Sequence, residues 1–107
     1  MVTIATRSDR LDCPFQALIE LLGRPHSLEI LYAIQTKNPR RFTELQSATG
    51  INPSTLTQRL RELTEAGLLL REAHNEIPPR VEYGLTKKGS GLAHVFEAMD
   101  RWYRKFG

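Results

Sequence analysis

The stretch FTELQSATGINPSTLTQRLRELTEAGLLLR, residues 42–71, contains two helix signals separated by a signal for a tight turn. The first helix is expected to begin at Thr43, whose hydroxyl can accept from free backbone donors, with Gln46 at the spacing of a capping box. Gly50 then supplies the left-handed backbone conformation that a sharp reversal of the chain needs. The turn is followed at once by a second set of helix signals.

The second helix is predicted over residues 53–66, because Asn52 suits the N-cap and the missing N–H of Pro53 is harmless at the first helical position. One narrow face is apolar and is expected to be buried: Leu56, Leu60 and Leu63. The opposite face is polar: Ser54, Gln58, Arg61 and Glu65. This layout over residues 43–66 is typical of a helix-turn-helix, whose second helix enters the major groove of DNA. An ordinary helical hairpin packed in a core is the alternative.

A two-stranded hairpin is predicted directly after these helices, over residues 68–86. Residues 68–73 are apolar and then charged, and residues 81–85 alternate with period two, so both are expected to be strands of an antiparallel pair. Pro78 and Pro79 in the connection withhold backbone donors and stiffen it. A hairpin in this place is the wing of a winged helix-turn-helix, and we use the word wing for residues 68–86.

A last amphipathic helix is predicted over residues 87–106, capped by Thr86 and firm from Leu92 onward, because residues 88–91 are poor helix formers. Its large apolar side chains either close the core of the domain or pair with a second copy of the chain. We expect the second and assign these residues to a homodimer interface: Leu92, Val95, Phe96, Met99, Trp102, Tyr103 and Phe106.

The amino-terminal third of the chain is expected to hold a flexible arm and two helices. Residues 1–12 show no sustained helical or strand period and form the arm, and residues 13–107 form one domain. Cys13 and Pro14 open a helix that ends at Gly23, and Ser27 is the expected N-cap of an apolar helix reaching Thr36. The fold class is therefore α+β, mainly helical: a winged helix-turn-helix with a two-stranded wing and terminal dimerisation helices.

Composition excludes several classes of function. The 107 residues include 15 basic and 12 acidic side chains, a net charge of +3 that favours a polyanionic partner without requiring one. One cysteine and three scattered histidines leave no disulfide framework and no plausible zinc ligand set. No membrane-spanning segment or secretory signal is present, so a cytoplasmic location is expected. No catalytic constellation or phosphate loop indicates an enzyme or a cofactor.

Several motifs resemble those of the HxlR family of bacterial and archaeal transcriptional regulators. They are Cys13-Pro14, RFTEL at residues 41–45, LTQRLREL at residues 56–63 and PPRVEYGLT at residues 78–86. The resemblance implies a winged helix-turn-helix that dimerises through its terminal helices and binds operator DNA. The chain departs from the family pattern at residues 24–27, where members usually carry glycine, lysine and tryptophan.

The site residues follow from placing the helix 53–66 in the major groove. Ser54, Thr55, Gln58 and Arg61 are directed at the DNA, where arginine bonds guanine and glutamine bonds adenine. Arg61 holding a phosphate, or Gln58 being only solvated, is the alternative. The remaining candidates contact phosphates or, on the wing, the minor groove: Arg41, Thr43, Arg59 and Arg80. The alternative for Arg80 is a salt bridge to Glu82 or Glu72 across the hairpin.

The predicted function is that of a dimeric repressor that binds an inverted-repeat operator in double-stranded DNA. Cys13 has a second hypothesis: a thiol at a helix N-terminus is stabilised as thiolate, and relatives in the resembling family sense oxidants or electrophiles at this place. An inert packed thiol is the alternative. The effector, a small molecule or an oxidant, is not identified. A winged-helix module that binds protein or RNA, without operator recognition, remains the other class of function.

Overall fold

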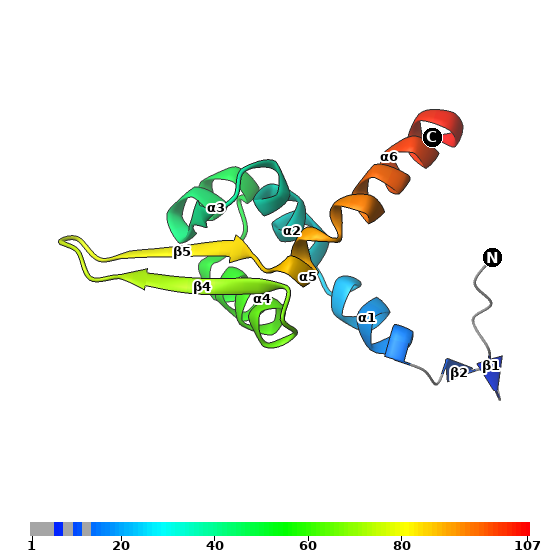
Figure 1. Ribbon diagram of the computed structural model, residues 1–107, viewed down its shortest axis with the longest axis horizontal. Helices are drawn as coiled ribbons and strands as arrows, with labels where there is room; N and C mark the ends of the chain where they lie inside the picture. The colour runs from blue at the N-terminus through cyan, green and yellow to red at the C-terminus, as the bar shows by residue number, and fades with distance from the viewer. Residues whose placement is uncertain (1–5, 8–9, 12–13) are drawn as a thin grey trace.

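The computed structural model describes residues 6–7, 10–11 and 14–107, which form six helices and five strands within these ranges. The helices are α1 (Pro14–Leu22), α2 (Ser27–Thr36), α3 (Phe42–Thr49), α4 (Pro53–Glu65), α5 (Lys87–Ser90) and α6 (Ala93–Phe106). The strands are β1 (Thr6–Arg7), β2 (Arg10–Leu11), β3 (Arg40–Arg41), β4 (Leu69–His74) and β5 (Arg80–Leu85). Figure 1 shows β4 and β5 projecting from one side of the helical body, and α1 and α6 lying at the other.

The first helix of the predicted pair, α3, begins at Phe42, one residue earlier than expected, and it is not capped by Thr43 and Gln46. Arg41 is the N-cap residue, and its backbone N–H donates to Oε1 of Glu44 at 2.9 Å. A carboxylate is a stronger acceptor than a neutral side chain and favours the positive end of the helix dipole. Glu44 therefore fixes the start of α3, and Thr43 is exposed within the first turn.

The turn and the start of α4 agree with the prediction. Gly50 has a φ of 71°, the left-handed conformation expected for the reversal. Asn52 caps α4, because its Oδ1 accepts from the backbone N–H of Ser54 at 2.8 Å, and Pro53 is the first helical residue. Ile51, between the two helices, is buried. Both ends of the connection are thus set by local side-chain chemistry.

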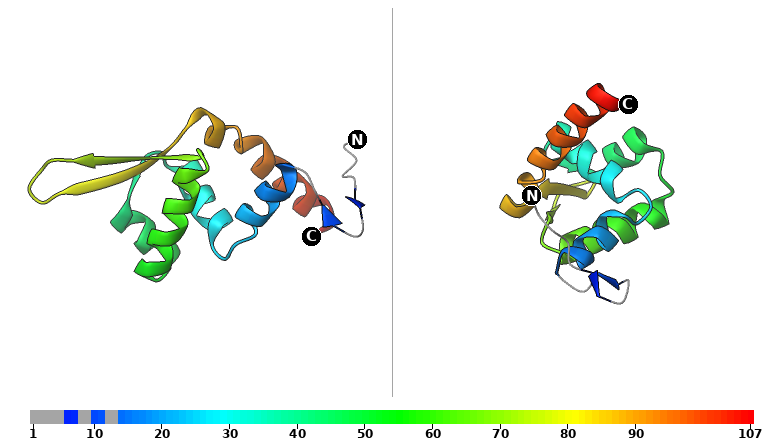
Figure 2. Two further views of the ribbon diagram at one scale, coloured as in Figure 1. Left: turned by 90° about the horizontal axis from the view of Figure 1, so that it is seen from below. Right: turned by 90° about the vertical axis from the view of Figure 1, so that its right-hand side faces the viewer.

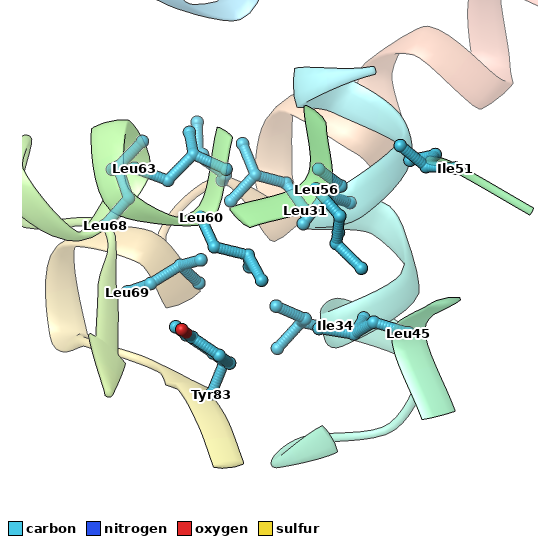
Figure 3. Packing of buried hydrophobic residues seen from close by; sticks show 12 residues of the cluster. Leu31, Ile34, Leu45, Ile51, Leu56, Leu60, Leu63, Leu68, Leu69 and Tyr83 are labelled. Carbon is cyan, nitrogen blue, oxygen red and sulfur yellow. The ribbon is translucent and has the colours of Figure 1, made fainter. Parts of the chain in front are cut away.

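The apolar face of α4 is the centre of the core (Figure 3). Leu56, Leu60 and Leu63 are fully buried, and burying a leucine contributes roughly 1.5–3 kcal/mol. They belong to one cluster with residues from α2, α3, β4, β5 and the connecting turns: Ile30, Leu31, Ile34, Leu45, Ile51, Leu68, Leu69, Tyr83 and Leu92. Since α4 is held along its whole length by this contact, its polar face is presented rigidly to solvent.

The amino terminus of α2 differs from the prediction. Ser27 is the first residue of the helix rather than its N-cap, and its side chain is fully buried. His26 precedes it with a φ of 72°, an uncommon conformation for a residue other than glycine, and makes no side-chain capping bond. The N-cap position of α2 is therefore occupied by a residue in the left-handed conformation, in the short connection that follows α1.

The wing is antiparallel as predicted, with Leu69 opposite Leu85 and His74 opposite Arg80. The sheet has a third strand that the sequence pattern does not predict, because β3 pairs Arg40 with Tyr83 and gives the order β3-β5-β4. β3 is two residues long, so it leaves no periodic signal. It ties the start of α3 to the wing.

The last predicted helix is broken into α5 and α6. Thr86 caps α5 as expected, since its Oγ1 accepts from the N–H of Gly89 at 3.0 Å. Gly89 is buried against the backbone, and an added Cβ would lie 2.1 Å from the carbonyl oxygen of Leu68. The chain turns again at Gly91 and Leu92, and α6 then leaves the body without a buried residue of its own.

The short ladder between β1 and β2 lies within the predicted arm, residues 1–12. Thr6 pairs with Leu11, and Arg7 pairs with Arg10. Residues 1–5, 8–9 and 12–13 lie outside the described part of the chain, so the predicted flexibility of the arm stays a prediction. The domain limits drawn at 13–107 likewise stay a prediction.

Candidate nucleic-acid interface

The outer face of α4 carries the side chains that the sequence directs at DNA. Ser54, Gln58 and Arg61 are exposed, and Thr55 is half-buried. Arg61 has no ion-pair partner among residues 14–107, so its guanidinium is available for a ligand. Gln58 is held weakly, since its Nε2 donates to Oε2 of Glu62 at 3.4 Å. This face therefore offers hydrogen-bonding groups with little internal competition.

A groove of about 980 Å³ runs from this face to the inner side of the wing. Its walls come from the start of α3, from α4 and from the β4–β5 hairpin, elements far apart in the sequence that Figure 2 shows along one side of the molecule. Four arginines and two glutamates line it: Arg41, Arg61, Arg71, Arg80, Glu65 and Glu76. Predicted site residues from all three elements are thus brought to one positively charged surface.

Arg71 is a groove residue that the sequence reasoning missed. It is exposed, and the described residues give it no ion-pair partner. Side chains alternate between the two faces of β4, so Arg71 shares a face with Leu69, two residues earlier. Leu69 is buried in the core, and Arg71 lies farther along the strand, where that face is exposed. The period of two along β4, together with the expectation that Leu69 is buried, would have placed Arg71 on this face from the sequence.

Arg59 does not join this surface. Its side chain is 13% exposed, Nε donates to the carbonyl oxygen of Pro25 at 2.9 Å, and Nη1 lies 3.1 Å from Oε1 of Glu62. Arg24 approaches the other oxygen of Glu62 at 3.2 Å. In this structure Arg59 fixes α4 to the loop between α1 and α2, and its phosphate contact stays a prediction.

Arg80 is held by acidic neighbours on the wing; of the partners that the alternative named, Glu82 is present at a long distance, while the close partner is Glu76. Its Nε lies 3.0 Å from Oε2 of Glu76, and its Nη1 lies 4.0 Å from Oε2 of Glu82. With 28% of its side chain exposed it still lines the groove, but its charge is partly compensated. Arg41 and Thr43 at the start of α3 are both exposed beside it.

Electrostatics at the start of α3 are set by Glu44. The N–H of Arg41, and then the ammonium group of Lys37 at 3.2 Å, lower the pKa of the Glu44 carboxyl below its ordinary value. The charge of Arg41 also lowers this pKa to a smaller extent, but the described residues show no ion pair between its guanidinium and Glu44. The side chains of Arg41 and Thr43 therefore remain directed at the groove.

The residues predicted for dimerisation divide into two groups. Leu92 is an exception to the prediction, because it is buried in the core of its own chain, and Phe96 is half-buried with its ring 5.4 Å from that of Tyr32. The others are exposed large apolar side chains: Val95, Met99, Trp102, Tyr103 and Phe106. Phe15 and Ile19 of α1 are exposed as well, on the helix that shares this end of the molecule (Figure 2).

The other features that the sequence raised lie away from this surface. Cys13, the candidate sensor, lies outside the described residues. No helix within the described residues is long and apolar enough to cross a membrane. His26, in the turn before α2, and His94, in α6, are exposed and belong to different elements, whereas His74 belongs to the wing, where it meets Glu72 and Glu82.

Comparison with known proteins supports the helix-turn-helix interpretation. Residues 21–107 match the family described as HxlR-like helix-turn-helix. An HTH-type transcriptional regulator of Halalkalibacterium halodurans is 36% identical over 92 residues, which cover 85% of this chain and 81% of that protein.

Solved structures give the same result for the fold. The reduced form of the transcriptional regulator YodB from B. subtilis has a TM-score of 0.77 at 32% identity, covering 89% of this chain and 94% of YodB. The reduced form of the redox regulator HypR has a TM-score of 0.72 at 27% identity, covering 87% and 92% of the two chains. The predicted winged helix-turn-helix and the predicted non-enzymatic class are confirmed, and the chain belongs to the HxlR-like helix-turn-helix family of transcriptional regulators.

Proposed function

We propose that the protein regulates transcription as a homodimer that binds an inverted-repeat operator in double-stranded DNA. The amino-terminal half of α4 enters the major groove, and the wing follows the adjoining backbone. The observation that carries the proposal is the continuity of the exposed polar face of α4 with a groove lined by four arginines. Bound at a promoter, such a dimer excludes polymerase and acts as a repressor.

Roles within this surface follow from position and charge. Arg61 projects from the turn of α4 that follows its amino-terminal half, where a bidentate contact to guanine gives roughly 1–3 kcal/mol of discrimination between bases. Ser54 and Thr55 at the first turn of α4 suit phosphate or base-edge contacts, and Gln58 reads a base once it releases Glu62. Four further residues border the groove: Arg41, Arg71 and Arg80 neutralise phosphates, and the hydroxyl of Thr43 donates a hydrogen bond to one.

The homodimer is supported by the apolar face of α6. Five large side chains from Val95 to Phe106 are more than 40% exposed, which a monomer in water does not favour. A second copy with the same face buries both at once in a two-fold interface. Two recognition helices related in this way would lie about 34–36 Å apart, one turn of B-DNA, so the operator is expected to be an inverted repeat.

Footprinting on the DNA that adjoins the gene for this protein would test the proposal, followed by fluorescence anisotropy with the protected duplex at several salt concentrations. Arg61→Ala should weaken binding to that duplex far more than binding to a random duplex. Arg80→Ala should weaken both and flatten the dependence of affinity on salt, because it removes a phosphate contact. If neither substitution changes the affinity, the assigned interface is wrong.

The same assay separates the other class of function. A winged helix that serves as an RNA-binding module would be competed off the duplex by single-stranded RNA at equal concentration, whereas an operator-binding protein would not. Absence of any protected DNA, together with unchanged anisotropy on all duplexes, would favour a module that binds protein.

A second candidate function is thiol-based sensing through Cys13. The specific finding in its favour is the similarity to the redox regulator HypR and to YodB, a regulator solved in a reduced form. Titration of the thiol with a chromogenic disulfide should give a pKa below the ordinary cysteine value, and diamide should change DNA binding in the native protein but not in Cys13→Ser. An ordinary pKa with binding insensitive to diamide would remove this candidate.

A further inference from the structure

Three side chains of the wing converge on one point of its outer face. Nε2 of His74 lies 2.8 Å from Oε1 of Glu82 and 3.1 Å from Oε1 of Glu72. The ligand atoms of all three residues lie within 4.8 Å of one another. Arg71 and Tyr83, the register pair next to Glu72 and Glu82, line the groove on the other face of the wing. The cluster therefore lies on the face opposite the groove, and Arg80, which lines the groove and lies 4.0 Å from Glu82, stands where the two surfaces meet.

The register of the wing concentrates negative charge here, and the guanidinium of Arg80 compensates it only in part, because it lies 3.0 Å from Glu76 but 4.0 Å from Glu82. Glu72 and Glu82 are directly opposite each other in the β4–β5 ladder, and like charges in that relation destabilise a hairpin. The side chains of His74 and Glu82 are only 26% and 21% exposed, so solvent screens them incompletely. A single imidazole N–H faces two carboxylate oxygens, and it can satisfy one of them well.

We propose that His74, Glu72 and Glu82 form a binding site for a divalent transition-metal ion of the zinc class. The donor set suits this class, because imidazole nitrogen combined with carboxylate oxygen is typical of zinc and its neighbours rather than of magnesium or calcium. Ligand atoms about 2.0–2.2 Å from a tetrahedral ion are roughly 3.3–3.5 Å apart. The nitrogen-to-oxygen separations of 2.8 and 3.1 Å therefore need to widen by roughly 0.5–0.7 Å at Glu82 and roughly 0.2–0.4 Å at Glu72.

The surroundings define how the site would be filled. Glu72 is 64% exposed, so its carboxylate is free to adjust, and water takes the fourth position. Two carboxylates and a neutral imidazole match the charge of a divalent ion. The guanidinium of Arg80, 4.0 Å from Oε2 of Glu82, opposes a second cation. It already pairs with Glu76 at 3.0 Å, so it gives up only its long contact with Glu82 when the ion binds. The ion links β4 to β5 near the free end of the wing.

Titration of the purified full chain with Zn²⁺, and separately with Co²⁺, would test the site. The chain should carry Cys13→Ser so that the thiol contributes no ligand. Competition with a chromogenic chelator gives the affinity, and visible absorption of bound Co²⁺ reports a site of low coordination number. We expect one ion per chain, affinity lowered about tenfold or more by His74→Gln and by Glu82→Gln, and a zinc-dependent rise in melting temperature that both variants lose.

His26→Gln is the matched control, because His26 also contacts a glutamate, with Nδ1 2.7 Å from Oε1 of Glu29, but has no second carboxylate. It should bind Zn²⁺ as the parent does. If His74→Gln unfolds the wing, Glu72→Gln at the exposed position provides the same test. Failure to saturate at one ion per chain, or equal binding by the parent and the His74 variant, would overturn the proposal, as would binding that requires Cys13.

Discussion

Two arginines two residues apart on α4 should have opposite phenotypes. Arg61 is exposed on the groove, whereas Arg59 is 13% exposed and donates to Pro25 and Glu62. Arg61→Ala should therefore reduce operator affinity without changing stability. Arg59→Ala should reduce stability and leave intrinsic recognition by the folded protein unchanged.

The magnitude for Arg59 follows from what its removal leaves behind. The carbonyl oxygen of Pro25 loses its donor, and Glu62, with a side chain only 19% exposed, keeps Arg24 as its remaining cationic partner. Hydrogen bonds to charged groups contribute about 1.5–3 kcal/mol each, and the surviving Arg24 contact offsets part of the loss. We expect unfolding to require about 2 kcal/mol less, which lowers the melting temperature by roughly 8 °C in a chain of this size.

The magnitude for Arg61 comes from recognition alone. One bidentate arginine–guanine pair discriminates by about 1–3 kcal/mol, so each half-site should lose roughly 5- to 150-fold in specific affinity. Binding to a random duplex should fall much less, because only one positive charge among many is removed.

Urea denaturation followed by circular dichroism would measure stability, and fluorescence anisotropy on specific and random duplexes would measure binding, both for the same preparations. Arg59→Lys is an informative intermediate, since it keeps the charge but cannot reach both acceptors with the fork geometry of arginine. The reasoning is refuted if Arg59→Ala lowers affinity at unchanged stability, or if Arg61→Ala destabilises the fold.

Three further outcomes follow from the packing. Gly89→Ala should destabilise the protein by about 1–3 kcal/mol in urea denaturation, because its Cβ would lie 2.1 Å from the oxygen of Leu68, whereas Gly91→Ala, with 3.4 Å to the nearest atom, should be close to neutral. Trp102→Ala should weaken the proposed dimer, because 62% of a side chain with a surface of about 250 Å² is exposed and becomes buried in the interface. Burying that area contributes roughly 3–4 kcal/mol per chain. Sedimentation equilibrium would measure the loss, with the exposed Glu97→Ala on the same helix as the control. Glu44→Gln should be less stable than the parent at pH 7, and the difference in stability should disappear in acid. The pKa of the Glu44 carboxyl is lowered in the folded state, so its contribution to stability is complete above the usual value of 4.5 and is lost as the pH falls through the folded-state pKa.

Local chemistry explains which parts of the fold were predictable. The boundaries of α4 depend on Asn52, Pro53 and three leucines at helical spacing, all of which act within a few residues of each other. The wing likewise follows from alternation along its own strands. In contrast, β3 is two residues long and exists only because it pairs with β5 some 40 positions later, which no short window of sequence can contain.

The sequence could predict which face of α4 carries the candidate site, but not which residues elsewhere in the fold bind its side chains. At 100° per residue Arg61 lies well away from the line of Leu56, Leu60 and Leu63, whereas Arg59 lies at its flank, so the sequence held a hint that Arg59 points toward the body. Its acceptor on Pro25 is 34 positions away and is known only from the fold. The pairing of Arg80 with Glu76 also depends on how the wing loop closes.

The contact of Arg59 and Glu62 with residues 24–25 has a practical consequence for protein engineering. Exchanging recognition helices between relatives is a direct way to transfer operator preference. In this chain the helix is attached to the α1–α2 loop, the same place where the sequence departs from the usual family pattern. A graft of residues 53–65 alone would separate co-adapted parts, so the loop and the helix should be transplanted together as one unit.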